Sequence, residues 1–214
     1  TTDNGHDLGE RGAFGKQYPN YDSHANIPLL VWHPRYPGSG RSIRALTQTV
    51  DTFATVLDAL GVPVPQPTHS RSLLPLLADG DATRDALLYG FFGQGVCVTD
   101  GEWTLFKSPE RDDPLFYYSS ILYRSLVAED ALQAPVDQGY FVPGATYPQW
   151  KIPTRYRTVT RENFLFHRAD DPGQTRNLWH SNAAQRERML GILRALLERE
   201  GTPPEQYERL GLRA

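Results

Sequence analysis

Two patterns of apolar residues alternate along the first third of the chain. Residues 27–32 form an almost unbroken apolar run, IPLLVW, which a His-Pro pair ends, and this pattern predicts a buried strand. Residues 49–60 instead repeat apolar side chains at helical spacing and stop at Gly61, which predicts an amphipathic helix. A strand, a turn and a helix in this order are typical of an α/β sheet layer. We therefore expect residues 1–80 to form part of an α/β domain.

Short β-like runs replace these patterns in the next part of the chain. Their β-branched and aromatic residues are bounded by turn residues, and an Asp-Gly pair joins two of them as in a β-hairpin. A hairpin and its neighbours indicate an antiparallel sheet. The runs cover residues 86–92, 96–100, 103–108 and 164–167.

A helical pattern closes the sequence. Residues 183–200 carry apolar side chains on one face, and a glycine and a proline follow them. We therefore expect a second unit, residues 81–214, in which a small antiparallel sheet packs on this helix. An insertion at about 109–163, rich in Tyr and Pro, shows no sustained period, and within it only residues 120–129 predict a helix.

Composition excludes several classes of protein. With 39% hydrophobic and 22% charged residues, the chain is typical of a globular domain. A net charge of -3 and a pI of about 6.1 offer no basic field for nucleic acid. No apolar run approaches the roughly 18 residues that a membrane span needs. We therefore expect neither a nucleic-acid partner nor a membrane span.

The first residues, TTDNG, are unusual for the start of a protein. They contain no initiator methionine and no charged or apolar leader segment. The two threonines suit the end of a β-strand, and Asn-Gly suits the loop after it. We interpret the chain as the carboxyl-terminal part of a longer protein, or as a chain trimmed by design.

Three residues near this start carry candidate chemistry. Asp3 and Asn4 place a carboxylate and an amide carbonyl side by side, and Ca²⁺ and Mg²⁺ prefer such hard oxygen ligands. The same Asp-Asn-Gly sequence is also common in simple turns. Lys16 follows Gly15, where the backbone can pass close to a ligand and the ammonium offers three donors to an anion.

The surrounding residues resemble a known family at three places in order. The segment TTDNGHDLGERGAFGKQYPNYDSHANIPLLVW resembles the part of the sulfatases, in the alkaline phosphatase superfamily, that holds the late metal ligands and the catalytic-site lysine. VDTFATVLDALGV, followed by SRSLLPLL, is similar to the helix and the G-x-S-L-x-P-L-L stretch of that family. FLFHRADDPGQTRNL resembles its L-Y-D-L-x-x-D-P-x-E-x-x-N-L signature.

This resemblance implies a fold and a set of roles. The fold is the C-terminal part of an alkaline-phosphatase-like α/β sandwich, followed by a small antiparallel sheet with a terminal helix. Asp3 and Asn4 would complete the coordination of a divalent cation, usually Ca²⁺, with Mg²⁺ or Mn²⁺ as alternatives. Lys16 would hold the sulfate oxygens and stabilise the leaving group of an aryl or carbohydrate sulfate ester. His6 and His24 flank this region and are candidates for contact with the substrate.

The family's nucleophile, a formylglycine made from Cys or Ser in a C/S-x-P-x-R motif, is expected upstream. Cys97 lacks that motif and has apolar neighbours, which favours an inert core thiol. The missing N-terminal part of the same protein would supply the nucleophile, and this chain alone is expected to be inactive. A phosphonate monoester or phosphodiester hydrolase of the same superfamily is one alternative, and a non-catalytic binding domain is another.

Three positions depart from the family pattern. Arg11 stands where many relatives have His, which affects the expected substrate specificity. Ser70 replaces the glycine of G-x-S-L, and His167 replaces the aspartate of L-Y-D-L.

Overall fold

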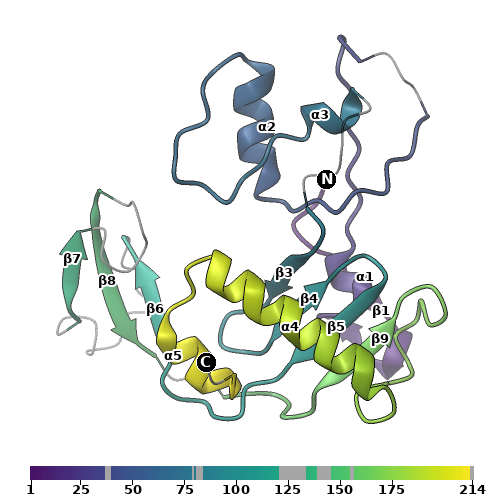
Figure 1. The fold of residues 1–214 in the computed structure, drawn as a ribbon, viewed down its shortest axis with the longest axis vertical. Helices are drawn as coiled ribbons and strands as arrows, with labels where there is room; N and C mark the ends of the chain where they lie inside the picture. The colour runs from purple at the N-terminus through teal and green to yellow at the C-terminus, as the bar shows by residue number, and fades with distance from the viewer. Residues whose placement is uncertain are drawn as a thin grey trace.

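The chain forms two regions: the α2 region, which is about residues 27–80, and the sheet region, which is built on antiparallel sheets. Figure 1 shows helices α2 and α3 together, apart from the sheet that α4 covers. No helix in the described ranges has the length and apolar character of a membrane span. The computed structural model describes residues 1–36, 40–78, 80, 84–120, 134–138, 146–154 and 157–212, and the account below concerns these residues.

A four-stranded antiparallel sheet of order β3-β4-β5-β9 forms the centre of the sheet region. Asp100 stabilises the turn between β4 and β5 because its Oδ1 accepts hydrogen bonds from the backbone N–H groups of Glu102 and Trp103. The strands predicted from the short β-like runs are confirmed. They are β3 (Leu87–Gly90), β4 (Val96–Thr99), β5 (Trp103–Lys107) and β9 (Phe164–His167).

Helix α4 (Ala183–Arg199) lies across one face of this sheet, as Figure 1 shows, and confirms the predicted terminal helix. The Asn182 side chain caps its first turn by accepting from Gln185 N. The apolar face of α4 packs on the sheet and completes the core. The fully buried side chains of this core include Met189 and Leu193 from α4 and Val98, Leu105 and Leu165 from the sheet. A short helix after it, α5 (Pro204–Leu210), was not predicted.

A second sheet lies in the segment predicted to be irregular. It consists of β6 (Phe116–Ser119), β8 (Pro148–Pro153) and β7 (Val136–Gln138), in the order β6-β8-β7. The prediction was wrong at these strands because β6 pairs with a strand some 30 residues away, where no local turn marks the pairing. The helix predicted over residues 120–129 lies almost wholly outside the described residues.

The strand predicted over residues 27–32 was also wrong. The structure has no strand there, and the Leu30 and Trp32 side chains are 82% and 85% exposed. An isolated strand leaves its backbone groups unpaired, and no described strand lies beside this run to pair with it. The apolar sequence therefore remains on the surface of the described chain.

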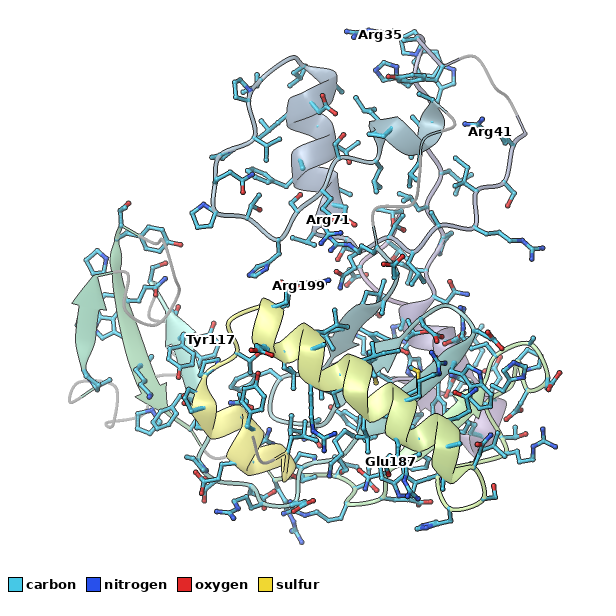
Figure 2. All side chains as sticks on the ribbon, viewed as in Figure 1. Arg35, Arg41, Arg71, Tyr117, Glu187 and Arg199 are labelled. Carbon is cyan, nitrogen blue, oxygen red and sulfur yellow. The ribbon has the colours of Figure 1, made fainter. Side chains whose placement is uncertain are left out.

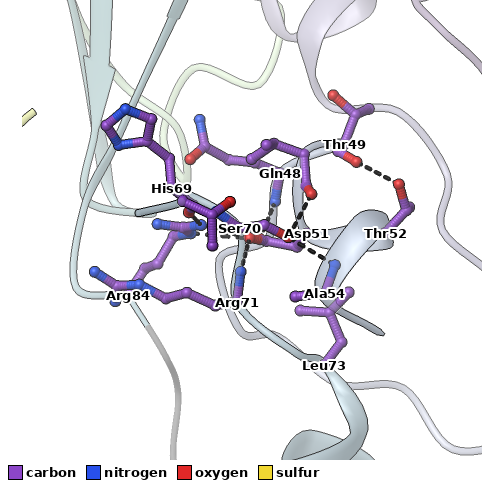
Figure 3. A network of polar contacts seen from close by, with 12 residues as sticks. Gln48, Thr49, Asp51, Thr52, Ala54, His69, Ser70, Arg71, Leu73 and Arg84 are labelled. Atoms are coloured by element: carbon purple, nitrogen blue, oxygen red, sulfur yellow. Dashed lines mark hydrogen bonds and ion pairs between the residues drawn. The ribbon is translucent and has the colours of Figure 1, made fainter. Parts of the chain in front are cut away.

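The predicted helix over residues 49–60 is confirmed as α2 (Asp51–Ala59), and α3 (Leu74–Leu77) lies beside it. Figure 3 shows the polar network that fixes the start of α2. Ser70 Oγ donates to Val50 O at 2.7 Å and accepts from Ala54 N at 2.8 Å. The hydroxyl that replaces the family's glycine therefore links the loop before α3 to the first turn of α2.

Asp51 lies at the centre of the same network and is fully buried. Its carboxylate accepts hydrogen bonds from Gln48 N at 2.9 Å and Arg71 N at 3.0 Å. The buried Arg84 guanidinium forms an ion pair with it. Because a buried charge is costly without a partner, each member of this pair depends on the other.

Candidate functional site

The candidate site is built on a small hairpin and a short helix at the start of the chain. β1 (Asp7–Leu8) pairs antiparallel with β2 (Phe14–Gly15), and the 3-10 helix η1 (Glu10–Gly12) lies between them. Gly15 has φ 95°, a left-handed conformation that glycine adopts readily, and Lys16 follows directly. Helix α1 (Asp22–Ala25) then places His24 behind the hairpin.

Asp3 and Asn4 lie side by side, as their adjacent positions predict. Asn4 Nδ2 donates to Asp3 Oδ2 at 2.8 Å, and Thr2 Oγ1 donates to Asp3 Oδ1 at 3.2 Å. Hydrogen bonding by the Asp3 backbone N–H, with further contributions from Thr2 and Lys16, lowers the pKa of the Asp3 carboxyl. Asp3 is therefore ionised at neutral pH, as a cation ligand must be.

Gly5 fixes these two residues against α1. Gly5 N donates to His24 O at 2.9 Å, and a Cβ at residue 5 would lie only 1.9 Å from Ser23 O. The glycine of Asp-Asn-Gly is therefore required by this close approach of two backbones, since its φ is not in the left-handed region.

One cavity of about 400 Å³ brings most of the predicted site residues together. Asp3, Asn4, Lys16 and His24 all line it. Lys16 has no ion-pair partner within the described part of the chain, which leaves its ammonium available to a ligand. His6 is exposed and is not among the lining residues.

His24 is the most buried of the predicted site residues, at 2% exposure. Its Nε2 lies 3.5 Å from Asp7 Oδ1, and neither ring nitrogen makes a hydrogen bond of good geometry with the described residues. Burial lowers the pKa of His24, and the nearby Asp7 carboxylate opposes this only in part. The imidazole is therefore neutral at neutral pH, and both of its ring nitrogens are buried beside the cavity without a hydrogen-bond partner among the described residues.

Asp7, which the sequence analysis did not single out, holds the hairpin to α1. Its Oδ1 accepts from Ser23 Oγ at 2.7 Å and from Arg11 at 2.8 Å. Burial acts to raise the pKa of Asp7, but the Ser23 and Arg11 contacts outweigh it and the pKa is lowered. Asp7 follows the Asp-Asn-Gly motif by two residues, and a lone carboxylate in a loop gives no signal that it is buried.

Arg11 is engaged in holding the hairpin and does not line the cavity. Besides its ion pair with Asp7, it donates to Gly173 O at 2.9 Å and lies 3.7 Å above the Tyr21 ring. The departure from the family pattern at this position is therefore explained by packing in this structure.

Cys97 is buried in β4, and burial raises the pKa of its thiol far above neutrality. This supports the prediction that it is an inert core residue. His167, the third departure, lies with Nδ1 2.8 Å from the Asp170 carboxylate and packs on Trp103.

The donor set at the cavity fits a hard divalent cation in kind. A carboxylate and an amide carbonyl supply two oxygens, whereas Ca²⁺ takes about 6–8. No group of three or more His, Cys, Asp or Glu side chains suited to a metal occurs among the residues that the structure describes. Asp3 and Asn4 can therefore form only part of a coordination shell.

Comparison with known proteins gives matches among sulfatases. Residues 9–99 match the family model described as N-sulphoglucosamine sulphohydrolase, C-terminal. The chain is 33% identical over 96 residues to the N-acetylglucosamine-6-O-sulfatase of Bacteroides thetaiotaomicron. That alignment covers 43% of this chain and 17% of the relative, so the chain spans only a small part of that protein.

Solved structures share the fold. One, described as in complex with its substrate D-glucosamine-2-N,6-O-disulfate, superposes with a TM-score of 0.65 at 18% identity, over 95% of this chain and 34% of that chain. A 2-O GAG sulfatase superposes with a TM-score of 0.59 at 16% identity, over 92% of this chain and 35% of that chain. The expected fold class, the C-terminal part of an alkaline-phosphatase-like α/β fold with a small antiparallel sheet and a terminal helix, is confirmed. This chain is therefore similar in sequence to the C-terminal part of sulfatases and shares the fold of that part.

Proposed function

We propose that this chain supplies part of the metal and sulfate site of an enzyme that hydrolyses sulfate esters. The observation that carries this proposal is the meeting of Asp3, Asn4 and Lys16, from separate loops, at one cavity. Sulfatases in general use a divalent metal, and Asp3 and Asn4 are the residues proposed to hold it. Ca²⁺ is the proposed ion, because oxygen-only donors suit it better than Zn²⁺, and Mg²⁺ or Mn²⁺ is the alternative. When bound, the ion would stabilise negative charge on the sulfuryl group.

Lys16 is proposed to bind the sulfate oxygens and to stabilise the leaving oxygen. Its ammonium borders the same cavity as the ionised Asp3 and has no ion-pair partner in the described ranges. A fixed positive charge at this position stabilises the negative charge that develops in the transition state, where electrostatic catalysis gains most.

His24 is proposed to hydrogen-bond the substrate from the buried side of the cavity. Its neutral ring can donate from one nitrogen, and neither nitrogen has a good internal partner among the described residues. His6 stays a prediction as a substrate contact, because it lies outside the residues that line the cavity.

The nucleophile, a formylglycine, and the remaining metal ligands are proposed to come from the upstream part of the same protein. The apolar surface of the α2 region supports such a partner. Leu30, Trp32, Val56 and Leu60 are 56% to 85% exposed, and exposed apolar side chains in this number indicate a surface that another part of a protein covers.

A carbohydrate sulfate is proposed as the substrate, in preference to an aryl sulfate. Besides the site residues, the cavity is lined by amide and hydroxyl side chains, which include Asn20, Asn26, Gln48 and Thr49. Such groups can pair with the hydroxyls of a sugar, while Leu29, Leu46 and Phe91 of the same lining supply apolar surface for its ring. The names of the relative and of the solved complex, both of which refer to glucosamine derivatives, support the same choice.

The test is hydrolysis by the natural gene product that contains this chain. We expect release of sulfate from glucosamine 6-sulfate, a loss of at least about 100-fold in kcat for Lys16→Ala, and loss of Ca²⁺ affinity for Asp3→Asn. Asp113→Asn, at an exposed carboxylate away from the cavity, and Arg35→Ala, at the far end of the α2 region in Figure 2, are the matched controls. Faster hydrolysis of an aryl phosphonate would favour the phosphonate hydrolase alternative. No turnover of either ester would favour a binding domain.

A further inference from the structure

The N-terminus of α1 is held by a residue that is distant in the sequence. The N-cap residue of α1, Tyr21, makes no capping hydrogen bond through its side chain. Instead, Gln174 Oε1 accepts from Asp22 N at 2.6 Å, and Gln174 Nε2 donates to Asp22 Oδ1 at 3.3 Å. One amide side chain thus contacts both the backbone and the side chain of the first residue of α1.

Gln174 is itself fixed in an unusual conformation. It is 3% exposed and has φ 50°, in the left-handed region that non-glycine residues adopt rarely and at a cost. Asp171 holds its loop in shape by accepting from Thr175 N at 3.0 Å and Arg176 N at 2.8 Å. The loop therefore keeps the amide in place before any ligand is present.

Arg168 holds the same aspartate from a second direction. Its Nε donates to Asp22 Oδ2 at 2.7 Å, and its Nη1 donates to Gly101 O at 2.8 Å in the turn between β4 and β5. Both oxygens of Asp22 therefore have partners, and one of these partners connects α1 to the central sheet.

Helix α1 in turn sets the position of the candidate site residues. His24 is one of its four residues, and the His24 carbonyl accepts the Gly5 N–H that ends the Asp-Asn-Gly motif. A Cβ at residue 5 would lie 1.9 Å from Ser23 O, so the two backbones are in close contact. A shift of α1 would therefore move Asp3 and Asn4 as well as His24.

We propose that Gln174 and Arg168 are positioning residues, which place α1 and through it the Asp3–Asn4 pair at the cavity. The assignment of the pair as metal ligands rests on the proposed function, whereas the mechanical link from Gln174 to Gly5 does not. A helix of four residues has little stability of its own, so its position depends on such contacts.

The test is amide hydrogen exchange measured by NMR on the full chain, with Gln174→Met to remove both hydrogen bonds at similar volume. We expect the Gly5 amide to exchange about tenfold faster, as loss of a hydrogen-bonded contact predicts, while the Val98 and Leu105 amides of the central sheet keep their rates. Faster exchange at Asp22 alone would reduce Gln174 to a local cap and overturn the proposal. An equal rise at every amide would show a general loss of stability and overturn it too.

Arginine variants supply an independent comparison. Arg168→Ala should accelerate Gly5 exchange, and Arg168→Lys should restore it in part, because a lysine keeps one charged hydrogen bond to Asp22. Arg176→Ala, in the same loop with an exposed side chain, should behave as wild type. Wild-type exchange at Gly5 in Arg168→Ala would contradict the assignment of Arg168.

Titration with Ca²⁺ in the same spectra separates this proposal from the proposed function. If Ca²⁺ shifts the Asp3 and Asn4 amides, we expect at least tenfold weaker binding in Gln174→Met. If Ca²⁺ shifts neither amide in wild type, these two residues do not hold the ion without the other proposed ligands, and the exchange rate of Gly5 still decides whether Gln174 positions the pair.

Discussion

Substitution of Gly5 by alanine perturbs the contact that places Asp3 and Asn4. A Cβ at residue 5 would lie 1.9 Å from Ser23 O, whereas Cβ atoms essentially never lie within 3.0 Å of another heavy atom. The two backbones must separate by about 1 Å or more, which breaks the bond from Gly5 N to His24 O. The lost hydrogen bond costs about 1 kcal/mol, and the residual overlap adds about 1 kcal/mol.

The effect on the site should exceed the effect on stability. Displacement of a catalytic group by about 1 Å can cost about 100-fold in rate. We therefore expect Gly5→Ala to lower kcat of the natural gene product on a carbohydrate sulfate by about that factor. Its free energy of unfolding in urea should fall by only about 2 kcal/mol.

Gly191→Ala is the matched control. Residue 191 lies in the middle of α4 with open space around its Cβ position, so alanine there should stabilise the fold by about 0.5–1 kcal/mol through helix propensity and leave kcat unchanged. Wild-type kcat in Gly5→Ala would refute the argument that this close approach positions Asp3 and Asn4, the proposed metal ligands.

Three further predictions concern the buried polar groups. Asp51→Ala should lower the free energy of unfolding by about 3–5 kcal/mol, because it leaves the buried Arg84 guanidinium without its carboxylate; urea unfolding of this variant beside Arg84→Met and the double variant measures the coupling. Ser70→Ala should cost about 1–2 kcal/mol in the same assay, since it removes two hydrogen bonds at the start of α2, and no loss would show that this link is dispensable. For His24, whose pKa is lowered in the folded state, protonation favours the unfolded chain, so this residue's contribution to stability is present above its unfolded pKa of about 6.5 and is lost as the pH falls below it. Urea unfolding at pH 7.5 and 5.5 should accordingly show a smaller drop in His24→Gln than in wild type, and an equal drop would contradict a neutral buried ring.

The sequence predicted the elements whose signals are local. The turn at Asp100-Gly101 and the helical period of α4 each depend on neighbours within a few residues, so the hairpin and the helix could be read directly. The sheet of β6, β7 and β8 could not, because its strands pair across long separations and their tyrosines and prolines carry no clear period. Residues 27–32 have a strong local strand pattern, but they form no strand because no described strand lies beside them to pair with.

The residues of the candidate site could be named from the sequence, whereas the contacts that support them could not. Asp3, Asn4 and Lys16 were identified from residue type and from the resemblance, and the structure brings them to one cavity. The carboxylate of Asp7 and the amide of Gln174 were not identified, because their importance comes from burial and from contacts across 16 to 152 residues. Such contacts leave no trace in local spacing.

Three arginines and the lysine of the candidate site have different contacts. Arg11, Arg84 and Arg168 each form an ion pair with an aspartate. The planar guanidinium can bond this carboxylate and a second acceptor at once. Lys107 and Lys151 lie near glutamates, whereas Lys16 borders the cavity with no carboxylate partner in the described ranges. A compact ammonium suits the proposed role of Lys16, which is to bind a sulfate and release it again, whereas the three arginines bind carboxylates within the fold. Lys16→Arg should therefore keep the positive charge but retain little activity. The larger guanidinium alters the position of that charge in a cavity of about 400 Å³.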